Sequence, residues 1–138
     1  MSEALYHAAL VARARAAFGK GRLADADATA TVDNPLCGDR VTLDLKVADG
    51  KIAAVGHDVR GCLLCEASAA TIAEFLRGKS NAEIEAIGNA AKRLMKEGAA
   101  DPQWDCLEIF TPVHNAKSRR DCVLLPFEAL KRAASAAF

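Results

Sequence analysis

The chain has 138 residues, and its eighteen basic side chains balance its eighteen acidic ones, which gives a formal net charge of zero at pH 7. This length suits one hydrophobic core, so we expect a single domain spanning residues 1–138. No one-sign block exceeds the short cluster at 117–120, so we expect neither nucleic acid nor an anionic membrane surface as a partner. No apolar run approaches the roughly 18 residues of a membrane span.

The first predicted element is a helix over residues 3–18, which Gly19 ends. The residues spaced on one face of this helix are Leu5, Ala9, Ala12 and Ala16. Glu3 and the internal arginines argue against a targeting peptide. A polar connection rich in Asp, Ala and Thr follows the helix.

Two antiparallel strands are predicted next, in VTLDLKVADGKIAAV at 41–55. Apolar residues alternate with polar ones up to residue 47, which is typical of a strand with one buried face. Asp49 and Gly50 supply a two-residue hairpin turn. The segment GHDVRG at 56–61 extends the second strand toward Cys62.

The rest of the chain favours helices. One runs over 62–76 before Gly78, and a second begins at the capping box SNAE at 80–83. A short piece at 104–110 leads through a loop to a last helix that carries Cys122 and that Ser118 can cap. Pro126 must bend this helix or shift its start. The predicted class is α+β, with a small antiparallel sheet and helices packed on one of its faces.

Five cysteines are present, an odd number, and the sequence lacks a secretion signal. A reducing compartment disfavours structural disulfides, so we expect a cytoplasmic protein whose thiols serve metal or sulfur chemistry. The five are Cys37, Cys62, Cys65, Cys106 and Cys122.

The spacing of the thiols indicates a metal site. Cys37 and Asp39 lie two residues apart in a Pro/Gly turn, and Cys62 and Cys65 occupy the first turn of a predicted helix, where thiolates are favoured. Three thiolates and one carboxylate would form a tetrahedral site for zinc or an iron–sulfur cluster. A redox CxxC pair is the alternative at 62–65. The three histidines are not expected to be ligands, and Cys106 is expected to be structural.

Three segments together resemble the IscU/NifU-type iron–sulfur cluster assembly proteins. They are DNPLCGDRVTLDLKV at 33–47, GCLLCEASAATIAEFLRGKS at 61–80 and RRDCVLLPFEAL at 119–130. Three features resemble the SufU branch of this family. The span between Cys62 and Cys122 is long, Asp121 stands where a His would precede the last cysteine, and the Leu-Pro-Pro-Val-Lys motif is missing.

The resemblance implies a scaffold that accepts sulfur from a SufS/IscS-like cysteine desulfurase and passes sulfur or a cluster to iron–sulfur acceptor proteins. It implies Cys37, Asp39, Cys62 and Cys122 as ligands of zinc or a [2Fe-2S] cluster, with Cys122 or Cys37 as the sulfur acceptor.

Two positions depart from the family pattern. FGKGRL at 18–23 replaces an Asn-Pro-Arg-Asn motif, and Cys65 stands where Ser is common, as an extra or substitute ligand or a resolving thiol. Two other functions remain open: a zinc-binding activator of a desulfurase that carries no cluster, and a CxxC thiol–disulfide protein.

Overall fold

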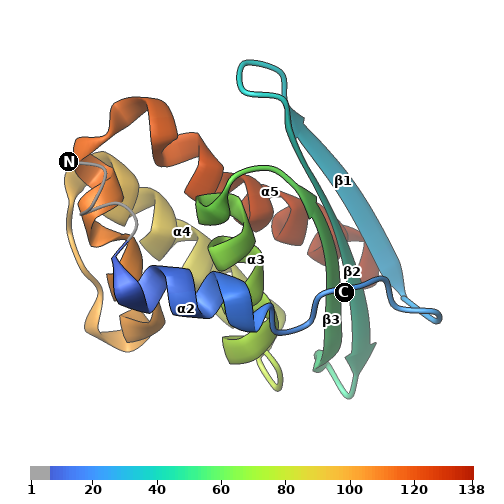
Figure 1. The fold of residues 1–138 in the computed structure, drawn as a ribbon. Coiled ribbons are helices and arrows are strands. Elements are labelled where there is room, and N and C mark those ends of the chain that lie inside the picture. The colour runs from blue at the N-terminus through green and yellow to red at the C-terminus, as the bar shows by residue number, and fades with distance from the viewer. Residues whose placement is uncertain (1–6) are drawn as a thin grey trace.

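The computed structural model of the chain describes residues 7–138. The elements in chain order are α2 (Ala8–Ala16), β1 (Ala28–Asn34), β2 (Asp39–Ala48), β3 (Lys51–Arg60), α3 (Leu63–Phe75), α4 (Asn81–Glu97), the 3₁₀ segments η1 (Pro102–Asn115) and η2 (Lys117–Arg119), and α5 (Arg120–Ala137). The strands form one antiparallel sheet in the order β1-β2-β3, and the helices cover one of its faces (Figure 1). This confirms the predicted α+β class. Within residues 7–138, no helix is both long and apolar enough to cross a membrane.

The central strand β2 carries the core face of the sheet. Val41, Leu43 and Leu45 are fully buried, as their alternation with polar residues predicts. The hairpin to β3 turns at Asp49 and Gly50, whose φ angles of 55° and 74° belong to the left-handed region. This is the turn that matches the twist of paired strands, so the predicted hairpin is confirmed.

Two predictions about the N-terminal part are wrong. The polar connection contains a strand, β1, whose inward residues are mostly alanines that give little hydrophobic signal. The first helix buries Leu10 and Ala14 instead of the predicted alanine face, because alanines on every side leave the helix with no dominant apolar stripe. The predicted position of Leu5 lies outside the described residues.

The predictions for the remaining helices are largely confirmed. Both hydrogen bonds of the capping box form at the start of α4, between Ser80 and Glu83. The last helix is different: it begins at Arg120 with Arg119 as N-cap and no side-chain cap bond, so Ser118 does not cap it. Ser118 lies instead within the 3₁₀ segment η2, which leads directly into α5.

The segment after α2 is held against the edge strand β3. The His57 backbone N–H donates to the Gly19 carbonyl at 3.2 Å, and the Gly21 N–H donates to the His57 carbonyl at 2.8 Å. The His57 ring is buried and donates from Nε2 to the Phe18 carbonyl at 2.8 Å. Gly56 lets the segment pass, because a Cβ on Gly56 would lie 2.6 Å from the Gly21 carbonyl oxygen.

Asp44 anchors this crossing segment from the middle of β2. Its buried carboxylate accepts hydrogen bonds from Arg22 Nε at 2.7 Å, from the Leu23 N–H at 2.9 Å and from Thr29 Oγ1 at 2.5 Å. Burial alone raises the pKa of Asp44. The donated hydrogen bonds outweigh burial, so the pKa lies below its ordinary value.

Replacing Asp44 by Asn should lower the free energy of unfolding at pH 7 by about 2–3 kcal/mol, because the buried donors lose a charged acceptor. A carboxyl whose folded pKa is lowered stabilises the fold above its unfolded pKa and loses that effect as pH falls through the folded pKa. The deficit of the variant should therefore shrink in acid. Urea unfolding at pH 7 and near pH 3 measures both effects, with the exposed Asp58→Asn as control. An equal deficit at both pH values would contradict this account.

Candidate metal centre

Four chain segments meet at one end of the sheet. β2 and β3 pair so that Arg40 faces Arg60, which places Asp39 beside the Gly61-Cys62 step that leads into α3. The ligand atoms of Cys37, Asp39 and Cys122 all lie within 4.8 Å of one another. The turn between β1 and β2, the start of β2 and the start of α5 therefore bring together three of the four predicted ligands.

Gly61 allows the carboxylate to sit where it does. A Cβ on Gly61 would lie 2.8 Å from Cγ of Asp39 and 2.9 Å from its Oδ1. Real Cβ atoms do not approach other atoms so closely, and any other residue at 61 would displace the carboxylate. The glycine before the first cysteine of the CxxC pair is thus a packing requirement of the site.

Ser68 holds the start of α5 against α3. Its buried hydroxyl donates a hydrogen bond of 2.6 Å to the Val123 carbonyl, the residue next to Cys122. This carbonyl lies in the first turn of α5, so the bond fixes the position of the helix start. The Ala-Ser run after the CxxC pair therefore positions a cysteine more than fifty residues away in the chain.

The thiols at the site differ in exposure and environment. Cys37 is exposed, Cys62 is half-buried, and Cys122 is 3 % exposed. Burial first, and then the charge and hydrogen bond of the neighbouring Cys62, raise the pKa of the Cys122 thiol to about 12, although a hydrogen bond from Arg119 acts to lower it. Cys62 is thus adjacent to Cys122, although it does not belong to the group of three within 4.8 Å.

Cys65 lies beneath the site. It is fully buried, and burial first, then the charges of Asp39, Cys62 and Cys122, raise the pKa of its thiol. Cys65 therefore stays a neutral thiol behind the donor atoms. Cys65 is not one of the residues whose ligand atoms lie within 4.8 Å of one another, so the structure gives less support to Cys65 as a substitute ligand than to Cys37, Asp39 and Cys122.

Asp39 supplies the observation that tests whether a metal fits. Asp39 is 7 % exposed, and within residues 7–138 its Oδ2 has no hydrogen-bond partner. A buried carboxylate oxygen without a partner is costly unless something binds it, and a cation among thiols is the group that its surroundings suit. The donor set of soft sulfurs and one oxygen fits zinc or iron.

The other sulfur and nitrogen candidates lie elsewhere. Cys106 is buried in η1, where its carbonyl accepts a hydrogen bond from Arg13, in agreement with the predicted structural role. His7, His57 and His114 each donate to a backbone carbonyl, and none of them belongs to the ligand group found among residues 7–138.

Sequence reasoning missed the positioning residues of the site. Gly61, Ser68 and Arg119 are not among the predicted ligands, and their roles depend on contacts with other segments of the chain. In the sequence, the only indication that Gly61 and Ser68 support the site was their position close to the CxxC pair.

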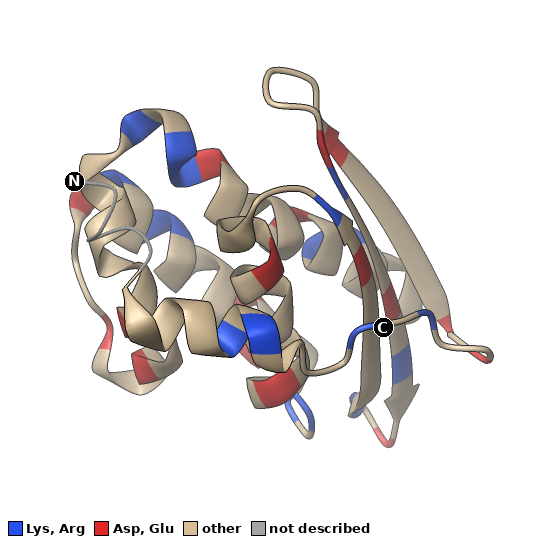
Figure 2. Ribbon diagram, viewed as in Figure 1, with Lys and Arg blue, Asp and Glu red and all other residues tan. Residues whose placement is uncertain are grey.

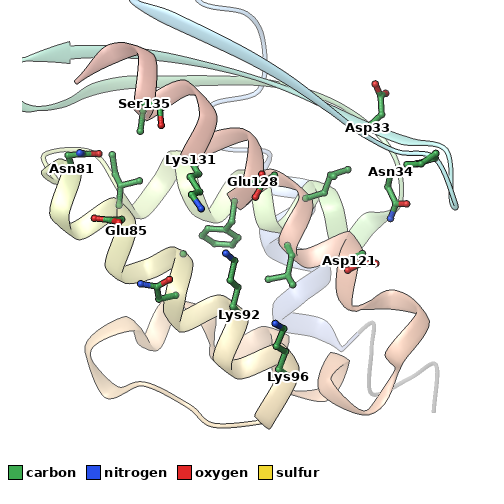
Figure 3. A pocket seen from close by; sticks show the side chains of 18 residues that line it. Asp33, Asn34, Asn81, Glu85, Lys92, Lys96, Asp121, Glu128, Lys131 and Ser135 are labelled. Carbon is green, nitrogen blue, oxygen red and sulfur yellow. The ribbon is translucent and has the colours of Figure 1, made fainter.

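A separate hollow of about 610 Å³ runs between α4, α5 and the end of β1 (Figure 3). Lys92 and Lys96 of α4 and Lys131 of α5 line it, together with Glu85 and Glu128. The cysteines do not line it, so it is distinct from the thiol site. Basic and acidic residues are both spread over the helices and strands of residues 7–138 (Figure 2).

Comparisons with known proteins agree with this geometry. The family model "NifU-like N terminal domain" matches residues 6–136. The iron–sulfur cluster assembly scaffold protein IscU of Thermotoga maritima is 28% identical over 130 residues, which are 94% of this chain and 92% of that protein.

Solved structures show the same similarity. The N-terminal domain of a NifU-like protein from Brucella abortus overlays with a TM-score of 0.91 at 31% identity, covering 99% of this chain and 96% of that one. FiSufU, from the SUF system of Fervidobacterium islandicum AW-1, overlays with a TM-score of 0.88 at 26% identity, covering 97% and 99%.

The sheet, its helical layer and the thiol-carboxylate end define the class of the iron–sulfur cluster assembly scaffolds. Within that class, the chain belongs to the NifU-like N-terminal domain family, which confirms the resemblance seen in the sequence.

Alkylation of the metal-free, folded protein should label Cys37 first and Cys62 more slowly, and should spare the other three cysteines. Burial hides Cys65, Cys106 and Cys122 and raises the pKa of each thiol, which leaves little thiolate to react. Iodoacetamide labelling followed by peptide mass mapping gives the order, and the same reaction in guanidinium chloride is the control. Labelling of Cys65 as fast as Cys37 in the folded protein would refute the assigned burial.

Proposed function

We propose that the protein is a scaffold on which sulfur from a cysteine desulfurase and iron are combined, and from which a [2Fe-2S] cluster is passed to an acceptor protein. The observation that carries this proposal is the convergence of Cys37, Asp39 and Cys122 within 4.8 Å, with Cys62 adjacent to Cys122. Membership of a family with scaffold proteins supports it. Five free thiols suit a cytoplasmic location.

The four groups have different parts in this function. Cys37, Cys62 and Cys122 would hold iron through soft sulfur, and Asp39 would supply the one hard ligand. Its Oδ2, which has no hydrogen-bond partner in the described part of the chain, supports this role. The same donors suit zinc, so a zinc-binding activator of a desulfurase that carries no cluster remains the second candidate. Metal analysis and an absorption spectrum of protein purified without oxygen distinguish the two.

Cys37 is the better placed of the two sulfur-acceptor candidates. It is exposed at the turn between β1 and β2, next to Leu36, which is 93 % exposed. A persulfide on a desulfurase is part of a large protein and can approach only an exposed thiol, whereas Cys122 is enclosed. We infer that sulfur arrives at Cys37 and that Cys122 receives it within the site.

Single replacements of Cys37, Cys62 or Cys122 by Ser should each lower the bound metal to well below one per chain, because each removes a thiolate ligand. Metal content by mass spectrometry, after reconstitution with zinc and separately with iron and sulfide, checks this. Cys106→Ser is the matched control, since it removes a buried thiol away from the site. Full metal retention in all three site variants would refute the assignment.

Replacing Asp39 by Ala should leave the fold intact and slow the transfer of bound cluster to an acceptor. A carboxylate is held less covalently than a thiolate and leaves first, so it opens the position through which an incoming thiol enters. Wild type and variant are loaded identically, and transfer to an apo-ferredoxin is followed by circular dichroism. Asp33→Ala, an exposed aspartate of β1, is the control. Equal or faster transfer from a folded Asp39→Ala protein would exclude the gating role.

A further inference from the structure

Cys62 and Cys65 occupy the N-cap and third positions of α3. Cys62 has φ −78° and ψ 171°, and its side chain makes no capping hydrogen bond. Cys65 is fully buried beneath the donor atoms and is not needed to complete a set of four ligands. The pair therefore contains one thiol with a proposed ligand role and one, Cys65, for which a resolving role predicted from the sequence is still open.

The start of α4 shows how close these two positions come. Its N-cap Ser80 has φ −85° and ψ 171°, nearly the same backbone as Cys62. There the Ser80 Oγ lies 3.3 Å from Oε1 of Glu83 and 3.3 Å from its backbone nitrogen. An N-cap side chain on this backbone can therefore reach the third residue of its helix. In the structure the Cys62 side chain makes no such contact and lies against Cys122, so a rotation about its Cα–Cβ bond is what would bring its sulfur toward Cys65.

A disulfide between these positions requires little movement. Side chains three residues apart on a helix have Cβ atoms about 5–6 Å apart. A disulfide needs about 3.5–4.5 Å, and an N-cap residue has non-helical dihedral angles that can adjust without breaking the helix.

We propose that Cys65 is a resolving thiol that releases sulfide from a persulfide on Cys62, an inference that rests on the proposed sulfur-accepting function. Sulfur would reach Cys62 by exchange from the adjacent Cys122. The Cys65 sulfur then attacks Sγ of the Cys62 persulfide. A Cys62–Cys65 disulfide forms, the bond to the outer sulfur breaks, and that sulfur leaves with the Cys65 proton as hydrogen sulfide.

The step balances without an outside reductant. The sulfane sulfur gains two electrons and becomes sulfide, and the two cysteine sulfurs lose them in forming the disulfide. Sulfide is the form of sulfur that bridges iron in a cluster, so the pair would complete the reduction inside the scaffold. An external dithiol reductant must then reopen the disulfide before Cys62 can bind metal again.

The test uses the full chain, reduced, stripped of metal and freed of small thiols. It is incubated without oxygen with a bacterial cysteine desulfurase that has been loaded with persulfide by L-cysteine and then separated from the free amino acid, while sulfide is measured with an electrode and persulfide by intact mass. Wild type should release sulfide in step with a Cys62–Cys65 disulfide found by peptide mapping. Cys65→Ser should accumulate persulfide and release sulfide at least about tenfold more slowly.

Cys106→Ser is the matched control and should behave as wild type, because it lacks a buried thiol outside the pair. Circular dichroism checks each fold, and Cys65→Ala replaces Cys65→Ser if the hydroxyl unfolds the chain. Wild-type sulfide release without a Cys62–Cys65 disulfide overturns the inference. So does persulfide on Cys65→Ser that releases sulfide at the wild-type rate, and in that case the proposed function stands. Absence of persulfide from every variant overturns both.

Discussion

The antiparallel register of β2 and β3 is the constraint on which the site depends. Because Arg40 pairs with Arg60, the first residue of β2 lies beside the residue that follows β3. Asp39 and Gly61, the residue before Cys62, are therefore brought together by backbone hydrogen bonds and not by the Asp39 side chain. A register shift by one residue would turn each side chain of the strand to the opposite face and separate them. The Ser68–Val123 hydrogen bond then adds the start of α5 to the same end of the sheet.

Two aspartates of β2 show how one strand supports both folding and chemistry. Asp44 is buried with a full set of donors, and its pKa is lowered, so its charge is satisfied by the fold itself. Asp39 is also buried, but one of its oxygens has no partner among residues 7–138. The first arrangement secures the segment between α2 and β1. The arrangement at Asp39 leaves one carboxylate oxygen able to bind a further group, and this oxygen lies next to the thiols of Cys37 and Cys122.

The thiols become more enclosed from the turn between β1 and β2 inward. Cys37 is exposed, Cys62 is half-buried and Cys65 is fully buried. This gradient suits a sequence in which a large partner delivers sulfur at the surface and the reactive intermediate is protected from solvent inside. The scaffold hypothesis and the thiol–disulfide hypothesis share one residue, because Cys62 is both a proposed metal ligand and the first cysteine of the CxxC pair.

Short-range chemistry determined what the sequence alone could predict. The α4 capping box and the Asp49-Gly50 turn involve residues at most three apart, so their patterns are visible in the chain. The thiol motifs likewise indicated the family and nominated the ligands. Tertiary structure decided the rest: the strand β1, the buried face of α2, the burial of Cys65, and an Asp39 oxygen without a partner among the residues that the structure describes. Each of these depends on partners far away in the chain, because alanines and lone polar atoms acquire a role only from what the fold packs against them.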